Sequence, residues 1–230
     1  IIDAEQRGTR AVIVERPFDC NIQLFQVNDC WKVMAELATE LRTELNPLVV
    51  ALTGSCGKKT TRTMIANILG NRGQTLQNKD NLNNTLGVPL TLLQLKAQDE
   101  FAVIEMGTNA PGEIAYSTSI VRPDVALITN VGPVHLQGFG TQEQVAHEKG
   151  QIFKGVSDNG CAVLNLDDQY YDSEADLTGL LDDNYEPISA AHFNATLINI
   201  TCLDTACNWD ANATDSCMYW PSGGKDCGAA

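Results

Sequence analysis

The sequence predicts an α/β fold, in which a mostly parallel β-sheet is flanked by helices. The first observation is that the candidate strands are near-continuous apolar runs, which is typical of strands covered on both faces. The second is that these runs alternate with segments of helical periodicity, as in a parallel sheet with helical crossovers. The expected strands are 49–53, 101–107, 124–130 and 161–166.

Two elements are expected before the first of these strands. Residues 8–15 indicate a short buried strand, and residues 29–45 indicate a helix that Pro47 ends. The apolar positions of this helix are Trp31, Val33, Met34, Leu37 and Leu41. Their spacing predicts the side of the helix that packs against the rest of the molecule.

Helices are expected between the strands of the sheet as well. Residues 60–71 have Met64, Ile65, Ile68 and Leu69 at helical spacing. A loop of Gly, Asn, Lys and Asp is expected over 73–85. The further helices are expected at 88–96, 112–120 and 141–155. Together with the strands, they form a repeating order of strand and helix.

Composition limits the possible functions. The chain has 230 residues and is 43% hydrophobic, which is enough to bury a sizeable core and excludes disorder throughout. The net charge of −14 argues against nucleic acid or an anionic membrane as the main partner. The acidity is uneven, because residues 1–150 carry a net charge of −3 and residues 151–230 carry −11. This shift predicts a boundary near residue 150.

The C-terminal segment has a different character from the rest. Only 195–201 indicate a strand there, and 204–230 are polar and without periodicity. Four of the eight cysteines are Cys202, Cys207, Cys217 and Cys227, at spacings that match no zinc pattern well. Two disulfides in a secreted chain are the alternative, with Asn194, Asn199 and Asn212 as glycosylation sites. We favour an irregular acidic, Cys-rich tail over 201–230.

No targeting or membrane segment is visible in the sequence. The first seven residues lack the apolar core of a signal peptide, and no apolar stretch approaches the length that a bilayer requires. We therefore expect a cytoplasmic, reducing location without membrane insertion.

Residues 53–61, Thr-Gly-Ser-Cys-Gly-Lys-Lys-Thr-Thr, lie between an apolar strand and a helix. A strand, a glycine loop and a helix N-terminus form a cradle for phosphate, called a P-loop. Gly54 and Gly57 let backbone N–H groups face an anion, and Lys58 can reach the terminal phosphates of a nucleotide. The expected ATP-binding residues are Thr53, Gly54, Ser55, Cys56, Gly57, Lys58, Lys59 and Thr60.

Two further side chains are expected at the same edge of the sheet. Glu105 ends the run 101–104, where open α/β sheets place ligand-binding groups, and a carboxylate beside a P-loop can hold Mg²⁺. His135 follows the next strand in a turn rich in Gly and Pro. His147 and Lys149 are, on local grounds alone, surface residues of a helix.

Four segments carry a resemblance to a known family. They are Asn81-Leu-Asn-Asn-Thr-Leu-Gly-Val-Pro-Leu-Thr-Leu-Leu, Ile104-Glu-Met-Gly-Thr-Asn-Ala-Pro-Gly-Glu-Ile, His135-Leu-Gln-Gly-Phe-Gly and Glu148-Lys-Gly-Gln-Ile-Phe. Residues 8–168 resemble the Mur ligases, and among them the MurF type, which adds D-alanyl-D-alanine to UDP-N-acetylmuramoyl-tripeptide. The resemblance implies a ligase of peptidoglycan precursor synthesis that forms an acyl phosphate with ATP. A monomer acting on these small molecules is expected.

The resemblance also implies roles for particular residues. Lys58, Glu105, His135 and Lys149 would be the catalytic residues. Glu105 and His135 would hold Mg²⁺, joined by Lys149 if it is carbamylated. Asn83, Asn84 and Thr85 would lie near the muramoyl substrate. The implied domains are a partial UDP-substrate-binding domain at 1–47 and the central ATP-binding domain at 48–200, with the C-terminal ligase domain absent.

One residue departs from the family pattern. Lys59 stands where a Thr hydroxyl normally ligates Mg²⁺, and a charged lysine offers no lone pair. We expect Lys59 to weaken the use of Mg²⁺-ATP unless Thr60 replaces the missing hydroxyl. The weaker option is that Lys59 itself supplies charge to the phosphates. Two alternatives therefore stay open: another Mur or folylpolyglutamate-type ligase, and a catalytically impaired nucleotide-binding module.

Overall fold

The computed structural model describes residues 2–156, 160–163, 165, 168 and 170. Its helices and strands follow one another as α1 (Ile2–Gln6), β1 (Ala11–Val14), β2 (Gln23–Gln26), α2 (Cys30–Leu45), β3 (Leu48–Thr53), α3 (Lys58–Gly70), β4 (Gln74–Gln77), α4 (Gly87–Leu92), β5 (Asp99–Glu105), α5 (Glu113–Val121), β6 (Val125–Ile128), α6 (Leu136–Phe139), α7 (Gln142–Gly150), the 3-10 helix η1 (Gln151–Gly155) and β7 (Cys161–Val163). The tail 201–230 and the strand predicted at 195–201 lie outside the described residues.

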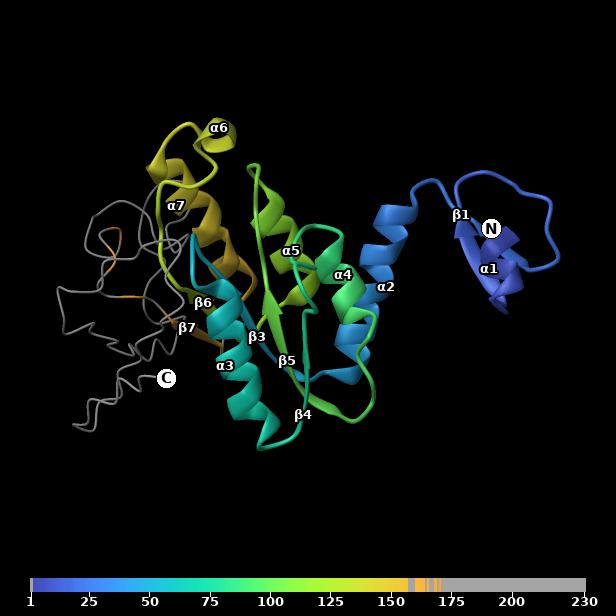
Figure 1. Ribbon diagram of the computed structural model, residues 1–230, viewed down its shortest axis with the longest axis horizontal. Coiled ribbons are helices and arrows are strands. Elements are labelled where there is room, and N and C mark those ends of the chain that lie inside the picture. Colours follow the sequence, from blue (N-terminus) through green and yellow to red (C-terminus); the bar gives the residue numbers. More distant parts are fainter. Residues whose placement is uncertain (1, 157–159, 164, 166–167, 169, 171–230) are drawn as a thin grey trace, which may run out of the picture.

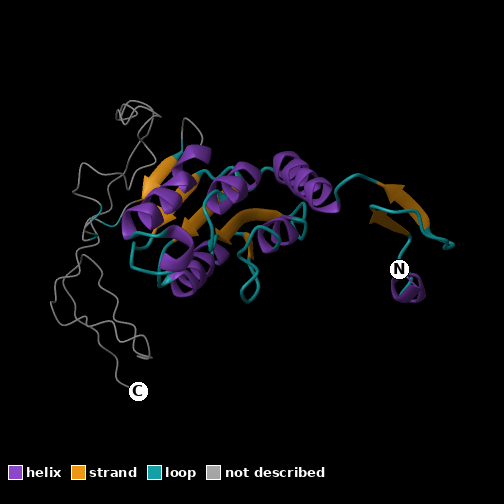
Figure 2. Cartoon of the chain, turned by 90° about the horizontal axis from the view of Figure 1, so that it is seen from above, coloured by secondary structure: helices purple, strands orange, loops and turns teal. Residues whose placement is uncertain are grey.

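Five strands form one parallel sheet in the order β4-β5-β3-β6-β7. Figure 1 shows α3 in front of this sheet, while α2, α4 and α5 gather beside one another. Helices cover both faces of the sheet when it is viewed from above (Figure 2). The predicted α/β fold with a mostly parallel, helix-flanked sheet is confirmed.

The register of the sheet explains which side chains face α3. Leu52 and Val103 pack with Ala66 of α3 in a small apolar cluster. Because strand side chains alternate between faces, Glu105, two residues after Val103, points to the same side. The opposite face contributes Val49, Ala51 and Ile104 to the larger core, which includes α2, α4 and α5.

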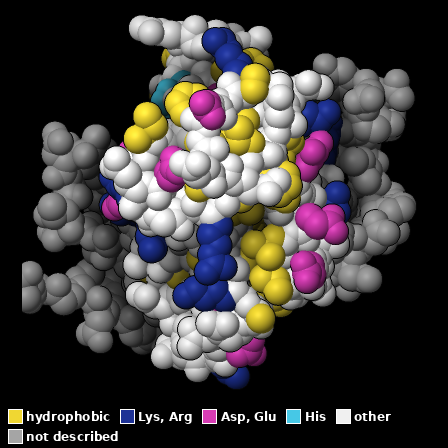
Figure 3. All heavy atoms as spheres, turned by 90° about the vertical axis from the view of Figure 1, so that its right-hand side faces the viewer, with side chains coloured by type: hydrophobic (Ala, Val, Ile, Leu, Met, Phe, Trp, Pro, Cys, Tyr) yellow, Lys and Arg dark blue, Asp and Glu magenta, His cyan; other side chains and the backbone are white. Residues whose placement is uncertain are grey.

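The strand predicted at 8–15 exists, but it is not buried. β1 pairs in parallel with β2 in a two-stranded sheet that lies apart from the main sheet (Figures 1 and 2). Val14 alone in β1 is buried, because among the described elements only β2 pairs with it. On the face seen in Figure 3, hydrophobic, basic and acidic side chains are interspersed.

The helix predicted at 29–45 is α2, and its inner face is the predicted one only in part: Leu41 packs against the core, and Val33 and Met34 are half-buried. Asp29 caps its N-terminus by accepting hydrogen bonds from the N–H groups of Trp31 and Lys32. Trp31 and Leu37 are exposed, and the buried residues of α2 are Ala35, Ala38 and Arg42. The small side chains of Ala35 and Ala38 allow α2 to pack closely on α4 and α5, whereas the larger side chains of Trp31 and Leu37 stay at the surface.

Other boundaries differ by a few residues from those predicted. The loop predicted at 73–85 contains the edge strand β4, whose terminal Gln74 and Gln77 hide the strand pattern. The helix predicted at 88–96 ends at Leu92, and the one predicted at 141–155 changes to a 3-10 helix after Gly150. Of the strand predicted at 161–166, residues 164 and 166 lie outside the description.

Candidate nucleotide site

The P-loop joins β3 to α3 at the carboxyl edge of the sheet. Gly57 lies at a φ of 77° and precedes α3 without any side-chain cap, which leaves the first N–H groups of the helix to face a ligand. A Cβ atom at Gly54 would collide with the Thr129 hydroxyl. Gly54 is thus needed for the close approach of Thr129 and Gly57 for its positive φ, and the loop has the geometry to accept an anion.

The end of β6 braces the P-loop. The N–H of Ser55 donates to the Asn130 carbonyl at 2.9 Å, and the N–H of Cys56 donates to Asn130 Oδ1 at 3.0 Å. Thr129 Oγ1 donates to the Cys56 carbonyl at 2.7 Å. Thr129 and Asn130 had no predicted role, although they directly follow an apolar strand, where open α/β sheets place ligand-binding groups. They fix the loop in its cradle conformation.

Lys58 points back into the loop that precedes it. Its ammonium donates to the Gly54 carbonyl at 2.6 Å. Burial lowers the pKa of Lys58, while the charge of the nearby Glu105 acts against this shift. The ammonium is thus held inside the cradle, where a phosphate oxygen can exchange for the carbonyl.

A small pocket of about 130 Å³ opens beside the P-loop. Its lining combines the glycine loop with residues from four later segments: Gly54, Lys58, Asn83, Asn84, Gly107, Thr108, Asn109, Val134, His135 and Lys149. The structure therefore brings together Lys58, His135 and Lys149, as the sequence predicted. Thr85 is not among the lining residues and instead borders a separate surface pocket with Trp31 and Tyr116.

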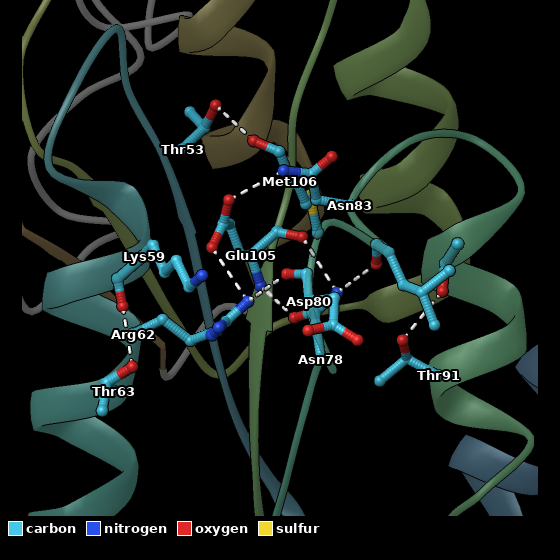
Figure 4. A network of polar contacts seen from close by, with 12 residues as sticks. Thr53, Lys59, Arg62, Thr63, Asn78, Asp80, Asn83, Thr91, Glu105 and Met106 are labelled. Carbon is cyan, nitrogen blue, oxygen red and sulfur yellow. Dashed lines mark hydrogen bonds and ion pairs between the residues drawn. The ribbon is translucent and has the colours of Figure 1, made fainter.

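Glu105 lies behind the pocket lining in a buried polar network (Figure 4). Its Oε1 accepts a hydrogen bond from Asn83 Nδ2 at 2.7 Å, and its Oε2 pairs with Arg62 Nη1 at 3.1 Å. The side chains of Glu105 and Arg62 are each 5% exposed. Asn78 holds the backbone of Glu105 by accepting from its N–H and donating to its carbonyl.

Arg62 and Asn78 were missed by sequence analysis. Arg62 is four residues after Lys58, so it lies one turn along the same face of α3. This spacing was the only sequence pattern that pointed to Arg62. Its pairing with Glu105 depends on how α3 packs on the sheet, which the sequence does not show. Arg62 Nη1 also donates to the Asp80 carbonyl at 3.2 Å, which connects α3 to the loop before α4.

Lys149 is a buried cation, not the surface lysine that its local sequence indicates. Its side chain is 2% exposed, and no hydrogen bond or ion pair to it is found in the part of the chain that the structure describes. Burial, followed by the charge of Lys58, lowers the pKa of Lys149 from 10.5 to about 7. The amine can therefore lose its proton near neutral pH and act as a nucleophile toward a small electrophile.

The remaining predicted residues lie in more open positions. His135 is exposed at a φ of 55°, before the short helix α6, and borders the pocket. His147 is exposed on α7, as expected. Lys59 and Thr60 are exposed on the first turn of α3, and neither lines the pocket. Within the described ranges, no three His, Cys, Asp or Glu side chains are grouped so that they could hold a metal ion.

Comparison with protein-family models decides the family. Residues 52–180, more than half of the chain, match the Mur ligase middle domain. This chain belongs to the Mur ligase family. The matched segment begins in β3 and includes the P-loop, Glu105, His135 and Lys149, so the Mur ligase middle domain contains all four predicted catalytic residues.

Two curated relatives of this chain have the same name. The UDP-N-acetylmuramoyl-tripeptide--D-alanyl-D-alanine ligase of Escherichia coli (strain K12) is 38% identical over 225 residues, which are 97% of this chain and 48% of the relative. The enzyme of the same name from Haemophilus influenzae is 40% identical over 174 residues, or 74% of this chain and 38% of the relative. The chain thus spans less than half the length of either relative.

Solved Mur ligase structures have a similar fold. A crystal structure of MurF from Acinetobacter baumannii has a TM-score of 0.67 and 40% identity, and covers 69% of this chain and 35% of its own. MurF ligase from Thermotoga maritima, in complex with ADP, has a TM-score of 0.66 and 36% identity, over 72% of this chain and 39% of its own. Among the described helices, none combines the length and the apolar character that crossing a membrane requires.

Proposed function

We propose that this chain carries the ATP site of a ligase that joins D-alanyl-D-alanine to UDP-N-acetylmuramoyl-tripeptide in peptidoglycan precursor synthesis. The observation that carries the proposal is one pocket that combines the P-loop lysine Lys58, the buried Lys149 and the amides of Asn83 and Asn84. The names of the relatives support the same reaction, and the ADP complex of the Thermotoga maritima MurF supports an adenine nucleotide.

The reaction needs an activated carboxylate, because a free carboxylate is a poor electrophile. A carboxylate oxygen of the tripeptide attacks the γ-phosphorus of ATP, the bond to the β,γ-bridging oxygen breaks, and ADP leaves. The amine of D-alanyl-D-alanine then attacks the acyl carbon of the acyl phosphate. Phosphate departs, the amine loses a proton, and an amide bond remains.

In this mechanism the protein contributes mainly position and positive charge. Lys58 and the N-terminal N–H groups of α3 would bind the phosphates of ATP, since both face the P-loop. Asn83 and Asn84 would orient the tripeptide carboxylate toward the γ-phosphate, with Thr85 farther along the same loop. Lys149 and His135 line the same pocket as Lys58 and would face the transferred phosphoryl group.

Mg²⁺ was predicted together with ATP, but the side chains of the site, in the arrangement of this structure, do not form a suitable set of ligands for it. Both carboxylate oxygens of Glu105 already have partners, and Lys59 offers an ammonium where a ligand oxygen is needed. The exposed His135 supplies one nitrogen, which is a poor ligand for this hard ion. We assign no step to the metal.

The domain boundaries, the monomeric state, the cytoplasmic location and the absence of nucleic-acid partners remain predictions. Four cysteines in the described part, Cys20, Cys30, Cys56 and Cys161, are free thiols, which is compatible with a reducing location. The other four cysteines and the glycosylation sites of the secreted alternative, which we do not favour, lie outside the described residues.

A second candidate function is a nucleotide-binding module that does not ligate. The replacement of a ligand hydroxyl by Lys59 and the engagement of Glu105 by Arg62 favour it. Phosphate release from ATP, measured with both UDP-N-acetylmuramoyl-tripeptide and D-alanyl-D-alanine present, separates the two. A ligase releases phosphate only when both are added. ATP binding without any such release would contradict the ligase proposal and support the module.

A further inference from the structure

The first turns of α3 bring an unusual amount of positive charge to one carboxylate. Lys58 and Arg62 lie one turn apart on the same side of α3, and the exposed Lys59 follows Lys58 in the first turn. Figure 4 shows the Lys59 side chain extending toward Arg62 and Glu105 rather than away from the network. Arg62 pairs with Glu105, and the charge of Glu105 also acts on Lys58.

Glu105 is already fully engaged by protein groups. Arg62 forms an ion pair with Oε2 at 3.1 Å, and Asn83 donates a hydrogen bond to Oε1 at 2.7 Å. To ligate a divalent ion, Glu105 would have to release a guanidinium that is 5% exposed and whose Nε has no hydrogen-bond partner among the described residues. Separating the pair would leave a buried charge without compensation, which is strongly unfavourable.

The same arrangement suits an anion that arrives without a metal. The Arg62 guanidinium neutralises Glu105 and so removes a charge that would repel phosphate. Lys58 and Lys149 both line the pocket, and Lys59 follows Lys58 in the first turn of α3. Basic side chains in and beside the pocket can then neutralise a polyphosphate without a divalent ion.

We propose that Arg62 and Lys59 take the place of a divalent ion at Glu105, so that this chain binds a nucleotide polyphosphate with little dependence on Mg²⁺. The ligand class is the free, metal-uncomplexed nucleoside di- or triphosphate. The proposal rests on the nucleotide site of the proposed function and concerns how that site holds its ligand. It makes Lys59 a functional replacement rather than a defect.

The test is calorimetric titration of ADP and of ATP into the full chain, once with EDTA and once with excess Mg²⁺. For the wild-type chain the dissociation constant should differ by less than about threefold between the two conditions. In Lys59→Thr, which restores a hydroxyl and removes a cation, Mg²⁺ should tighten binding by about tenfold or more. Lys32→Thr is the matched control, because Lys32 is an exposed lysine in the first turn of α2.

Arg62→Met supplies a second variant and should also gain a response to Mg²⁺, because it frees Glu105. Arg62 is buried, so thermal unfolding must first show that this variant is folded; Lys59 is exposed, and Lys59→Thr does not depend on that condition. A wild-type chain that binds nucleotide about tenfold or more tightly with Mg²⁺ would overturn the inference and leave the nucleotide site intact. A Lys59→Thr chain that stays indifferent to Mg²⁺ would overturn the role of Lys59. No binding in either condition would instead contradict the proposed function.

Discussion

The carboxylate of Glu148 accepts a hydrogen bond from the backbone N–H of Ile114 at 2.8 Å, across 34 residues of sequence. Its second oxygen accepts from the N–H of Gly112, also at 2.8 Å, so one buried side chain caps the start of α5. This contact fixes the last turn of α7 against α5. Lys149, the next residue, is thereby held at the pocket.

Replacing Glu148 should therefore destabilise the fold. Glu148→Ala leaves the N–H groups of Gly112 and of the buried Ile114 without their acceptor, and we expect a loss of about 2–4 kcal/mol in the free energy of unfolding. Urea denaturation measures it. Glu143→Ala, at an exposed position of the same helix, should cost clearly less than Glu148→Ala. Equal losses in the two variants would show that the cap to α5 contributes nothing.

The two P-loop glycines should respond differently to alanine. Gly54→Ala places a methyl group on the Thr129 hydroxyl that braces Cys56, so the loop must shift and ATP affinity should fall by about tenfold or more. Gly57→Ala meets open space but keeps a positive φ, which should cost about 1–2 kcal/mol of stability. Titration with ATP and urea denaturation of both variants measure the difference. Unchanged ATP affinity in Gly54→Ala would contradict the cradle geometry.

The buried Lys149 should make stability depend on pH. The pKa of Lys149 is about 7 in the folded chain, against 10.5 for the free side chain, so the unfolded state binds more protons between these values. The wild-type chain should thus gain stability relative to Lys149→Met as pH rises from about 7 to about 10.5. Urea denaturation of both chains at several pH values isolates this contribution.

The charged groups that act on Lys149 determine the size of that effect. Lys58 on α3 lowers its pKa, whereas Glu148 on its own helix and Cys56 in the P-loop raise it. Lys154→Met, at an exposed position of η1, is the control and should show the same pH dependence as wild type. A constant difference between wild type and Lys149→Met over this pH range would show that Lys149 is not a perturbed group.

The central fold could be predicted because its strands carry a strong signal. The apolar runs of β3, β5 and β6 are typical of strands that are buried on both faces. Parallel strands bring their carboxyl ends to one edge of the sheet, which is why Lys58 and His135 line the same pocket. β4 was missed because, as an edge strand, it begins and ends in glutamine.

The site network could not be predicted from residue types and spacing. Whether Glu105 faces solvent or a guanidinium depends on how α3 packs on β5, and no local pattern of either segment contains that information. The same holds for Lys149, which is buried because Glu148 ties α7 to α5. Thr85 belongs to the predicted substrate loop, but the loop turns so that only Asn83 and Asn84 border the pocket.

Lys58 and its glycine loop are expected to bind the phosphates of ATP, and the proposed function depends on this binding. Calorimetric titration of ATP into the full chain and into Lys58→Met tests it most directly, with Lys154→Met as an exposed lysine control. We predict binding of one ATP to the wild-type and Lys154→Met chains and affinity weaker by about tenfold or more in Lys58→Met. Equal affinity in Lys58→Met, or no binding to the wild-type chain, would contradict the account.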